Sequence, residues 1–324
     1  MISSYGEALV DLIEQADGRF LPCLGGSVSN FSVAVARQGV PSTYLNPLSS
    51  DNFGKRFAAL YAANGVMRTQ ALASPCPTAL AVVTLNERHE PSYVFHHETV
   101  ADRAIDLATL QRCWPASTRI LHTGCLTLTP QDIEQTLALL KFAKSHGAVL
   151  SVDANIRPLA TPQRARYLAH VEQALLHANI IKLSDEDLAA LLPTVNPEEP
   201  QAMANHYFRA SPSIELIVYT RGAQGATLIT RQQQTSLPVP SGLKVVDTVG
   251  AGDCFAAALL TWLLKASTPS DAGQPELDVL NVIRHATVQE LNTALRHALA
   301  AAGINVSRAG CDPATWAETV AALI

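Results

Sequence analysis

Charged residues are scarce in this chain, and no stretch of it is basic. Asp, Glu, Lys and Arg make up 16% of the 324 residues, and the formal net charge is −5. Proteins that bind nucleic acid neutralise backbone phosphates with clustered lysine and arginine side chains. The composition therefore argues against a nucleic-acid partner, while a hydrophobic content of 48% is enough for a sizeable buried core.

Cysteine is present, but never at the C-x-x-C spacing of zinc sites and redox motifs. The six cysteines stand far apart in the sequence, which predicts small buried side chains in a reducing compartment rather than metal ligands. The adjacent residues His96 and His97 are a poor metal site as well, because neighbouring side chains on a strand point to opposite faces.

Long apolar runs are also missing. The first residues, MISSYGEALVDLIEQ, lack the basic region and apolar stretch of a signal peptide. The longest apolar run, AAALLTWLL, falls far short of the roughly 20 residues that span a bilayer and predicts a buried helix. These absences predict a cytoplasmic protein without a membrane partner.

Short apolar strands alternate with amphipathic helices along the chain. Strands are predicted at 120–128, 148–155, 179–184 and 215–220, and helices at 132–147, 165–178 and 185–193. This β-α-β rhythm predicts a parallel sheet covered by helices on both faces. We therefore expect a single α/β domain over residues 1–324, with three α/β/α layers and a central, mostly parallel sheet.

Two segments break this rhythm. Residues 78–98 have the pattern of two strands joined by a charged turn, and residues 17–26 form another extended stretch. Together they predict a small antiparallel sheet, built from about 15–26 and 78–100, that stands off the main domain. A projecting sheet exposes its edges, and pairing with a second copy would cover them, so we expect a homodimer. Residues 266–276 predict a polar surface loop.

The segment DTVGAGDCF, residues 247–255, is the strongest functional signal. The strand-like KVV precedes it and the apolar CFAAALLTWLLK follows it, so that Gly250, Ala251 and Gly252 open a helix. Backbone N–H groups in a first helical turn have no partner within the helix and carry a partial positive charge. Glycines let an anion approach that backbone closely. The segment therefore predicts an anion hole.

Three alternatives compete for this segment. A dinucleotide loop, G-x-G-x-x-G, would need a third glycine where Phe255 stands, and the phosphate loop G-x-x-x-x-G-K-[ST] is absent. A tight turn that only caps a helix stays open. Asp253 favours a catalytic site, because a carboxylate beside an anion hole can take the proton of an attacking hydroxyl during phosphoryl transfer.

With this segment the chain resembles the ribokinase-like sugar kinases, also called the phosphofructokinase-B family, whose C-terminal signature is D-T-x-G-A-G-D-x-F. The likeness extends along the whole chain. Other matching segments are GGSVSNFSVAVARQG (25–39), SDNFGKRF (50–57), KLSDED (182–187) and YTRGAQGA (219–226). DANIRP (153–158) resembles the form found in fructokinases and 2-keto-3-deoxygluconate kinases, and YVFHHETVADR (93–103) resembles fructokinases; as a whole the chain is most similar to the bacterial fructokinases.

The resemblance implies a ribokinase-like domain whose small sheet is a lid, and phosphorylation of a sugar hydroxyl by ATP. It makes Asp253 the catalytic base and assigns the anion hole to Gly250, Ala251 and Gly252. The residues that it implies for the sugar are Asp11, Gly25, Gly26, Asn30, Phe95 and Arg157.

Two of these assignments keep an alternative: Arg157 as a surface arginine and Phe95 as a core or hairpin aromatic. For the nucleotide and Mg²⁺, the implied residues are Lys182, Ser184, Asp187, Thr220, Gly222 and Gly225.

Several positions depart from the family pattern. Ser184 and Asp187 replace the usual Asn and Glu, which predicts an altered water-mediated Mg²⁺ network. Leu299 stands where relatives commonly have an Asn, which affects adenine selectivity. Asp247 matches a monovalent-cation ligand of relatives that K⁺ activates.

The favoured substrate is D-fructose, phosphorylated to fructose 6-phosphate. A 2-keto-3-deoxygluconate kinase shares the D-x-N-x-R pattern, but its keto-acid needs a further cation, and Arg88 and Arg103 fall in the charged turn and after the lid. A ribokinase or nucleoside kinase is a third alternative. Outside this class, a non-catalytic sugar- or nucleotide-binding protein on the same scaffold would fit the departures at Ser184, Asp187 and Leu299.

Overall fold

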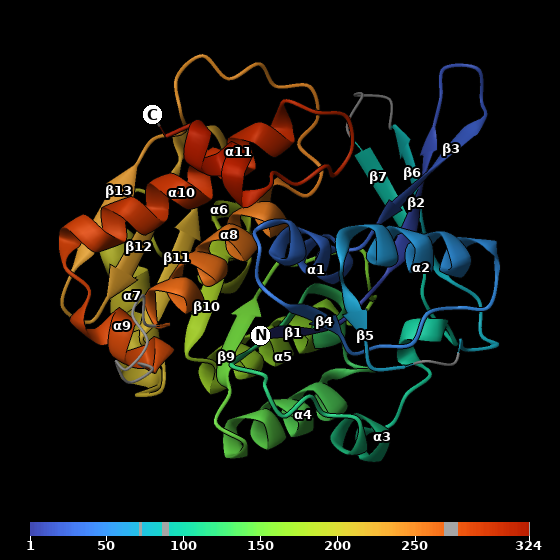
Figure 1. Ribbon diagram of the computed structural model, residues 1–324, viewed down its shortest axis with the longest axis horizontal. Coiled ribbons are helices and arrows are strands. Elements are labelled where there is room, and N and C mark those ends of the chain that lie inside the picture. Colours follow the sequence, from blue (N-terminus) through green and yellow to red (C-terminus); the bar gives the residue numbers. More distant parts are fainter. Residues whose placement is uncertain (71–72, 86–90, 269–277, 324) are drawn as a thin grey trace.

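Figure 1 shows the computed structural model, which describes residues 1–70, 73–85, 91–268 and 278–323. Its larger sheet has nine strands. In spatial order they are β13 (Gln234–Leu237), β12 (Ala226–Thr230), β11 (Leu216–Thr220), β10 (Ile180–Ser184), β9 (Val149–Asp153), β8 (Ile120–Gly124), β1 (Ile2–Tyr5), β4 (Ser42–Tyr44) and β5 (Met67–Arg68). Neighbours from β11 to β5 run parallel, and only β12 and β13 are added antiparallel. The prediction of a mostly parallel central sheet is confirmed.

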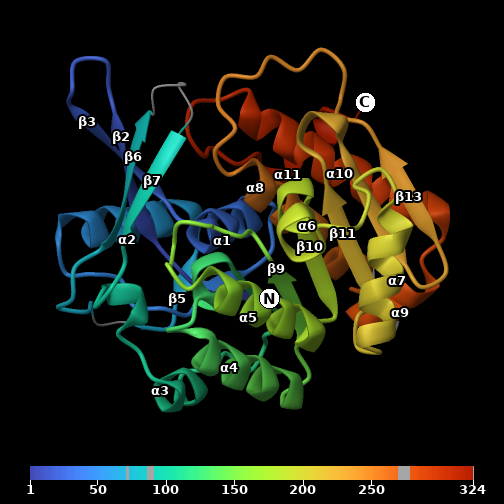
Figure 2. The same ribbon diagram turned by 180° about the vertical axis from the view of Figure 1, so that it is seen from behind.

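Helices cover both faces of this sheet. One layer contains α1 (Ser27–Arg37), α8 (Ala251–Ala266), α9 (Val279–His285) and α10 (Val288–Val306), with α11 (Trp316–Ala321) packed on α10. The opposite layer, seen in Figure 2, contains α3 (Leu107–Arg112), α4 (Ile133–Ser145), α5 (Arg164–His177), α6 (Asp185–Leu191) and α7 (Pro200–Ala210).

Alternating strand residues feed the two hydrophobic cores. Ile180 and Leu216 pack with α1, α8 and α10 on one face, while Ile181 and Ile217 pack with α4 and α5 on the other. Successive side chains of a strand point to opposite faces, and strands buried on both sides therefore read as continuous apolar runs. This is why the sequence indicated these strands so clearly.

A smaller sheet projects from the main body (Figures 1 and 2). It contains β3 (Phe20–Gly25), β2 (Leu9–Glu14), β6 (Ala79–Leu85) and β7 (Pro91–His96) in that order, and α2 (Asn52–Asn64) packs near its base. The sheet therefore also includes Leu9–Glu14, which precedes the predicted segment 15–26 in the sequence. The prediction of a purely antiparallel sheet is wrong for one pair, since β2 and β6 run parallel.

Strand register brings two predicted sugar residues to one face of the small sheet. Ala81 pairs with Asp11 on β2 and with Phe95 on β7, and directly paired residues share a face. His96, the last residue of β7, is exposed, whereas His97, the first residue after the strand, is buried. The opposite orientation expected for these two histidines is confirmed.

Two predicted strands differ from the structure. The stretch 120–128 ends as a strand at Gly124 and continues as the short 3₁₀ helix η2 (Cys125–Leu128). Residues 244–246 (KVV) form no strand. Instead, the amides of Val246 and Asp247 donate to the Val306 carbonyl at the end of α10, at 2.8 and 3.2 Å. Val245 and Val246 are exposed, so these valines are apolar without being part of a sheet.

The remaining sequence expectations concern side chains and loops. None of the six cysteines is in a disulfide; Cys125 and Cys254 are buried and the others half-buried. Within the described ranges, no helix is both long and apolar enough to cross a membrane. The charged turn at 86–90, which includes Arg88, and most of the predicted polar loop at 266–276 lie outside the described residues.

Candidate active site

The predicted site lies at the carboxyl edge of the large sheet. The last residues of four adjacent parallel strands meet there: Gly124, Asp153, Ser184 and Thr220. The register pairs Gly124 with Asp153 and Ser184 with Thr220. In open α/β sheets, ligands bind beyond this edge, so the fold alone already points to this region.

Asp253 is the centre of the site. It lies in the first turn of α8 and is 8% exposed. Its Oδ1 accepts a hydrogen bond from Ser27 Oγ at 2.6 Å, and its Oδ2 accepts one from Asn30 Nδ2 at 3.0 Å. Asn155 Nδ2 donates in turn to Ser27 Oγ at 2.8 Å. The carboxylate is thus oriented by groups from α1 and from the loop after β9.

Burial raises the pKa of Asp253, while the hydrogen bonds from Ser27 and Asn30 and the charges of Lys182 and Arg157 lower it. These effects oppose one another, and a carboxyl group in this setting can hold and release a proton. Ser27 was not singled out in the sequence, although it directly follows the double glycine of the N-terminal segment.

The beginning of α8 has the geometry that the GAG segment predicted. Gly250 precedes the helix with a left-handed φ of 73°, and no side chain caps the helix. A Cβ at this position would lie 2.3 Å from Cys311 Sγ, so glycine is required for both conformation and space. Ala251 and Gly252 are the first two residues of the helix.

A buried ion pair lies next to this helix start. Lys182 Nζ is 2.8 Å from Asp153 Oδ2, and both side chains are almost fully buried. A Cβ at Gly252 would lie 3.4 Å from the same Nζ. Burial lowers the pKa of Lys182, but the Asp153 carboxylate more than offsets this, so the ammonium group stays charged. Asp153 was missed in the sequence; its signal is its place at the end of a buried strand.

Asp11 and Arg157 approach the site from its other side. Burial raises the pKa of Asp11 to about 6, the charge of Arg157 lowers it, and that of Asp253 raises it, which places the three groups in one electrostatic neighbourhood. A Cβ at Gly25 would lie 2.4 Å from Asp11 Oδ2, and glycine there leaves room for the carboxylate.

The other predicted sugar residues lie close by in the fold. Gly26 immediately precedes α1, and Asn30 lies in the first turns of that helix. Phe95 packs against a small buried cluster that contains Leu9 and Ala81. Arg157 is half-buried, so it is not a simple surface arginine.

Ser184 and Asp187 form a reciprocal cap at the beginning of α6. Asp187 Oδ2 accepts from the Ser184 amide and hydroxyl, both at 2.8 Å, while the Ser184 hydroxyl accepts from the Asp187 amide. Asp187 Oδ1 accepts from the Ile156 amide at 2.7 Å. Asp187 thereby fixes the loop that presents Asn155 and Arg157, and its link to Mg²⁺ stays a prediction.

The nucleotide-side residues form a separate group. Thr220 ends β11, and Gly222 and Gly225 bracket the turn that follows. Asp247 binds the amides of Val249 and Gly310 at 3.0 and 2.9 Å, which joins two loops. Leu299 packs in the core of the α8–α10 layer.

No cluster of three or more histidine, cysteine or acidic side chains suited to a metal ion occurs within the described part of the chain. A Mg²⁺ ion held by one or two carboxylates and the substrate phosphates needs no such cluster. Asp153, whose partner Lys182 lies next to the helix start, is a carboxylate that could serve it.

Comparisons with known proteins agree with this geometry. Residues 1–318 match the family described as pfkB family carbohydrate kinase. A fructokinase of Rhizobium leguminosarum bv. trifolii is 30% identical over 267 residues, 81% of this chain and 79% of that protein.

Two solved structures share the fold over nearly the whole chain. Fructokinase from Xylella fastidiosa with bound ATP has a TM-score of 0.83 and 26% identity, covering 99% of this chain and 97% of that one. Fructokinase from Vibrio cholerae O395, bound to fructose, ADP and a calcium ion, has a TM-score of 0.79 and 25% identity, covering 100% and 98%.

The buried ion pair yields a prediction about stability. Lys182→Met leaves the Asp153 carboxylate buried without its partner, so the free energy of unfolding should fall by about 3–5 kcal/mol. Urea denaturation followed by circular dichroism measures this. The double variant Lys182→Met/Asp153→Leu should regain most of the loss, because neither charge remains. Arg19→Met, which breaks an exposed pair with Asp17, is the control and should change little. A Lys182→Met protein as stable as the wild type would contradict the prediction.

Proposed function

This chain belongs to the pfkB family of carbohydrate kinases, and we propose that it transfers the γ-phosphoryl group of ATP to D-fructose, giving fructose 6-phosphate and ADP. The observation that carries the proposal is the buried Asp253 carboxylate, which Ser27 and Asn30 orient beside the uncapped beginning of α8. The fructokinase names of the relatives support fructose as the sugar.

Each part of the site has a role in the transfer. Asp253 takes the proton of the sugar hydroxyl while the hydroxyl oxygen forms a bond to the γ-phosphorus. The bond between that phosphorus and the bridging oxygen, which leaves with ADP, breaks. The backbone amide of Gly252 and the Lys182 ammonium stabilise the charge on the transferred group, and the Ala251 amide, which donates to the Thr248 carbonyl at 3.2 Å, would have to exchange that bond to join them. A bound Mg²⁺ would neutralise further phosphate charge, and Asp153, beside Lys182, is a carboxylate that could hold it. A role for K⁺ at Asp247 remains part of this proposal.

Asp11 and Arg157 are proposed to bind the sugar. A carboxylate accepts hydrogen bonds from neighbouring hydroxyls, and a guanidinium donates to their oxygens. Phe95 shares the sheet face of Asp11 and can cover an apolar face of the ring. A keto-acid substrate is less well served, because Arg103 is already bound to Asp132 and to the His97 carbonyl.

The substrate proposal is tested by ADP release over a panel of fructose, 2-keto-3-deoxygluconate, ribose and adenosine. Fructose should give the highest kcat/KM. A higher value for another member would replace fructose with that substrate. If folded protein releases ADP with none of them but is stabilised thermally by a sugar, it is a binding protein instead.

Removing the catalytic base gives a second prediction. Asp253→Asn keeps the size of the side chain but cannot accept the proton, so kcat should fall by about 10²–10⁴-fold. Because burial raises the pKa of Asp253, wild-type kcat should also fall at acidic pH, where the carboxyl group is protonated. Circular dichroism and the melting temperature control for folding. Turnover by Asp253→Asn close to that of the wild type would remove Asp253 from this role.

We also propose that the small sheet acts as a lid, that it pairs with its copy in a homodimer, and that the enzyme works in the cytoplasm. Both outer strands of the sheet, β3 and β7, carry exposed apolar side chains: Phe20, Leu21, Tyr93 and Val94. Pairing would cover both edge and apolar surface. Six unpaired cysteines agree with a reducing compartment.

Light scattering coupled to size exclusion tests the homodimer. The wild type should have twice the mass of one chain, and Val94→Glu should shift it to the monomer by placing a charge in the interface. Val320→Glu is the matched control, because Val320 is an exposed valine on α11. A monomeric wild type, or an undisturbed Val94→Glu dimer, would argue against pairing through this sheet.

A further inference from the structure

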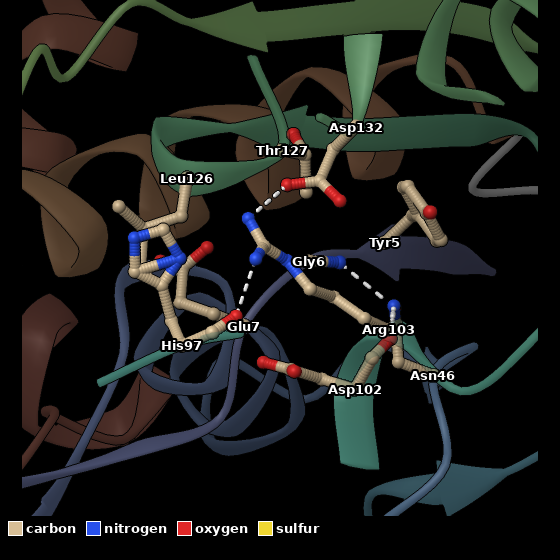
Figure 3. Close-up of a pocket in the computed structure, with 10 residues that line it drawn as sticks. All are labelled: Tyr5, Gly6, Glu7, Asn46, His97, Asp102, Arg103, Leu126, Thr127 and Asp132. Atoms are coloured by element: carbon tan, nitrogen blue, oxygen red, sulfur yellow. Dashed lines mark hydrogen bonds and ion pairs between the residues drawn. The ribbon is translucent and has the colours of Figure 1, made fainter. Parts of the chain in front are cut away.

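A small cavity collects buried polar side chains that the proposed transfer does not use. It has a volume of about 20 Å³, and Figure 3 draws the residues that line it. Three of them end in a buried polar atom without a hydrogen-bond partner: Glu7 Oε2, His97 Nδ1 and Asp102 Oδ1. All three residues are more than nine-tenths buried.

The cavity lies where the chain crosses between the two sheets. Glu7 belongs to the short link from β1 of the large sheet to β2 of the small one. His97 and Asp102 belong to the link that leads back from β7 to α3. The cavity thus lies between two of the connections on which the small sheet is mounted.

The three unpartnered atoms are all acceptors when both carboxyl groups are ionised. His97 Nε2 lies 3.1 Å from the Ala160 carbonyl, which only accepts, so Nε2 carries the hydrogen. Burial lowers the pKa of His97 to about 4, the ring is neutral near pH 7, and its Nδ1 offers a lone pair. Three buried acceptors that face one cavity are unfavourable without a donor.

The side-chain N–H donors around the cavity are already engaged, and the Cys125 thiol is only a weak donor to Glu7. The Arg103 guanidinium binds the His97 carbonyl and Asp132, as Figure 3 shows. Asn46 Nδ2 donates to the Asp102 backbone carbonyl at 2.8 Å. A proton on one of the two carboxyl groups supplies the missing donor, and the cavity has room for one water molecule to relay it.

Glu7 is the better site for this proton. Burial raises the pKa of Glu7 to about 8, and the charges of Asp102 and Asp253 act in the same direction. Burial also raises the pKa of Asp102, to about 7, but the neighbouring Arg103 lowers it. No cation is among the main groups that act on the pKa of Glu7, whereas Arg103 favours the ionised form of Asp102.

The other oxygen of Glu7 leads to the catalytic base. Glu7 Oε1 accepts from the Ser27 amide at 2.9 Å, and Ser27 Oγ donates to Asp253 Oδ1 at 2.6 Å. One carboxyl group therefore contacts both the cavity between the lid connections and the residue that orients Asp253.

We propose that Glu7 is a positioning residue for phosphoryl transfer and acts as a neutral carboxylic acid. Its Oε1 holds Ser27 against Asp253, and the proton on its Oε2 is donated into the cavity toward His97 and Asp102. This role rests on the function proposed above for Asp253. If Glu7 lost this proton, its Oε2 would face the acceptor atoms of His97 and Asp102 without a donor between them. Their repulsion would displace the Glu7 carboxylate, which would loosen the lid connections and the contact with Ser27.

Several groups surround Glu7 and contribute to its titration. Those of the cavity are Tyr5, His97, Asp102, Arg103 and Asp132. Those of the other packed elements are Tyr44, Tyr61, Cys125, Arg157, Tyr167 and Asp253.

Glu7→Gln tests the proposal, because glutamine is neutral, keeps an acceptor for Ser27 and presents an N–H donor to the cavity. Its kcat at pH 6.5 should stay within about twofold of the wild type. Above pH 8, wild-type kcat should fall by about tenfold per pH unit as Glu7 ionises, and the variant should lack this decline. KM for fructose and ATP, measured alongside, separates positioning from substrate binding.

Stability gives a readout that does not need turnover. Glu7 loses its proton near pH 4.5 in the unfolded chain but only near pH 8, its raised pKa, in the folded protein. Between these two values only the folded protein holds the proton, so folding becomes less favourable as pH rises through this window. The melting temperature of the wild type should therefore fall relative to that of Glu7→Gln between these two pH values. At higher pH, the difference between the two melting temperatures should stay constant. Glu134→Gln, an exposed first-turn glutamate of α4, is the control and should behave as the wild type.

Carboxyl-labelled glutamate in wild-type protein provides a further check by carbon NMR. One glutamate resonance should titrate near pH 8, and Glu7→Gln should lack it. A Glu7→Gln protein that misfolds or loses activity at every pH, or that keeps the alkaline decline, would overturn the proposal. Activity in Asp253→Asn would instead sink the catalytic role of Asp253, while leaving the titration of Glu7 intact.

Discussion

Two hydrogen bonds to one carboxylate hold this site together. They join Asp253 at the beginning of α8 to Ser27 and Asn30 at the beginning of α1, more than 220 residues away in the sequence. Their geometry depends on how closely the two helices pack, and α8 presents consecutive alanines, residues 256–258, to the shared core. Small side chains allow close helix approach, so the composition of a buried helix helps to set the position of a reactive oxygen several ångströms away.

The site concentrates buried acidic groups, and each is balanced differently. Asp153 has a cation, Lys182, in direct contact. Asp187 has three backbone or hydroxyl donors and caps a helix. Asp11 has the charge of Arg157 against the cost of burial. Among the described residues, Glu7 has no cation in direct contact and too few donors, and protonation lowers the cost of burying it. The same physical cost thus leads to a structural ion pair, a helix cap, a proposed substrate ligand and a proposed neutral acid.

The sequence indicated the fold well because strands buried on both faces leave continuous apolar runs, and it indicated the beginning of α8 because glycine has few substitutes at position 250. The sequence did not indicate residues whose type alone does not show what they contact in the fold. Ser27, Asp153 and Glu7 are ordinary residue types whose roles arise from contacts across the fold. The valines of KVV resembled a strand, but the end of α10 takes up their backbone hydrogen bonds. Leu9–Glu14 was not predicted as a strand, since Asp11 interrupts its apolar run.

A sugar kinase must couple the arrival of its substrate to the readiness of its base, since a base exposed to water without a sugar could serve hydrolysis of ATP. The chain offers a short path for this coupling. Asp11, on the small sheet, faces the site, and the connections of that sheet converge on Glu7, which touches Ser27. A shift of the small sheet that changes the cavity therefore also affects the hydrogen bond that the Ser27 amide donates to Glu7. A single buried carboxyl group can in this way transmit the position of the sheet to Asp253, the proposed proton acceptor.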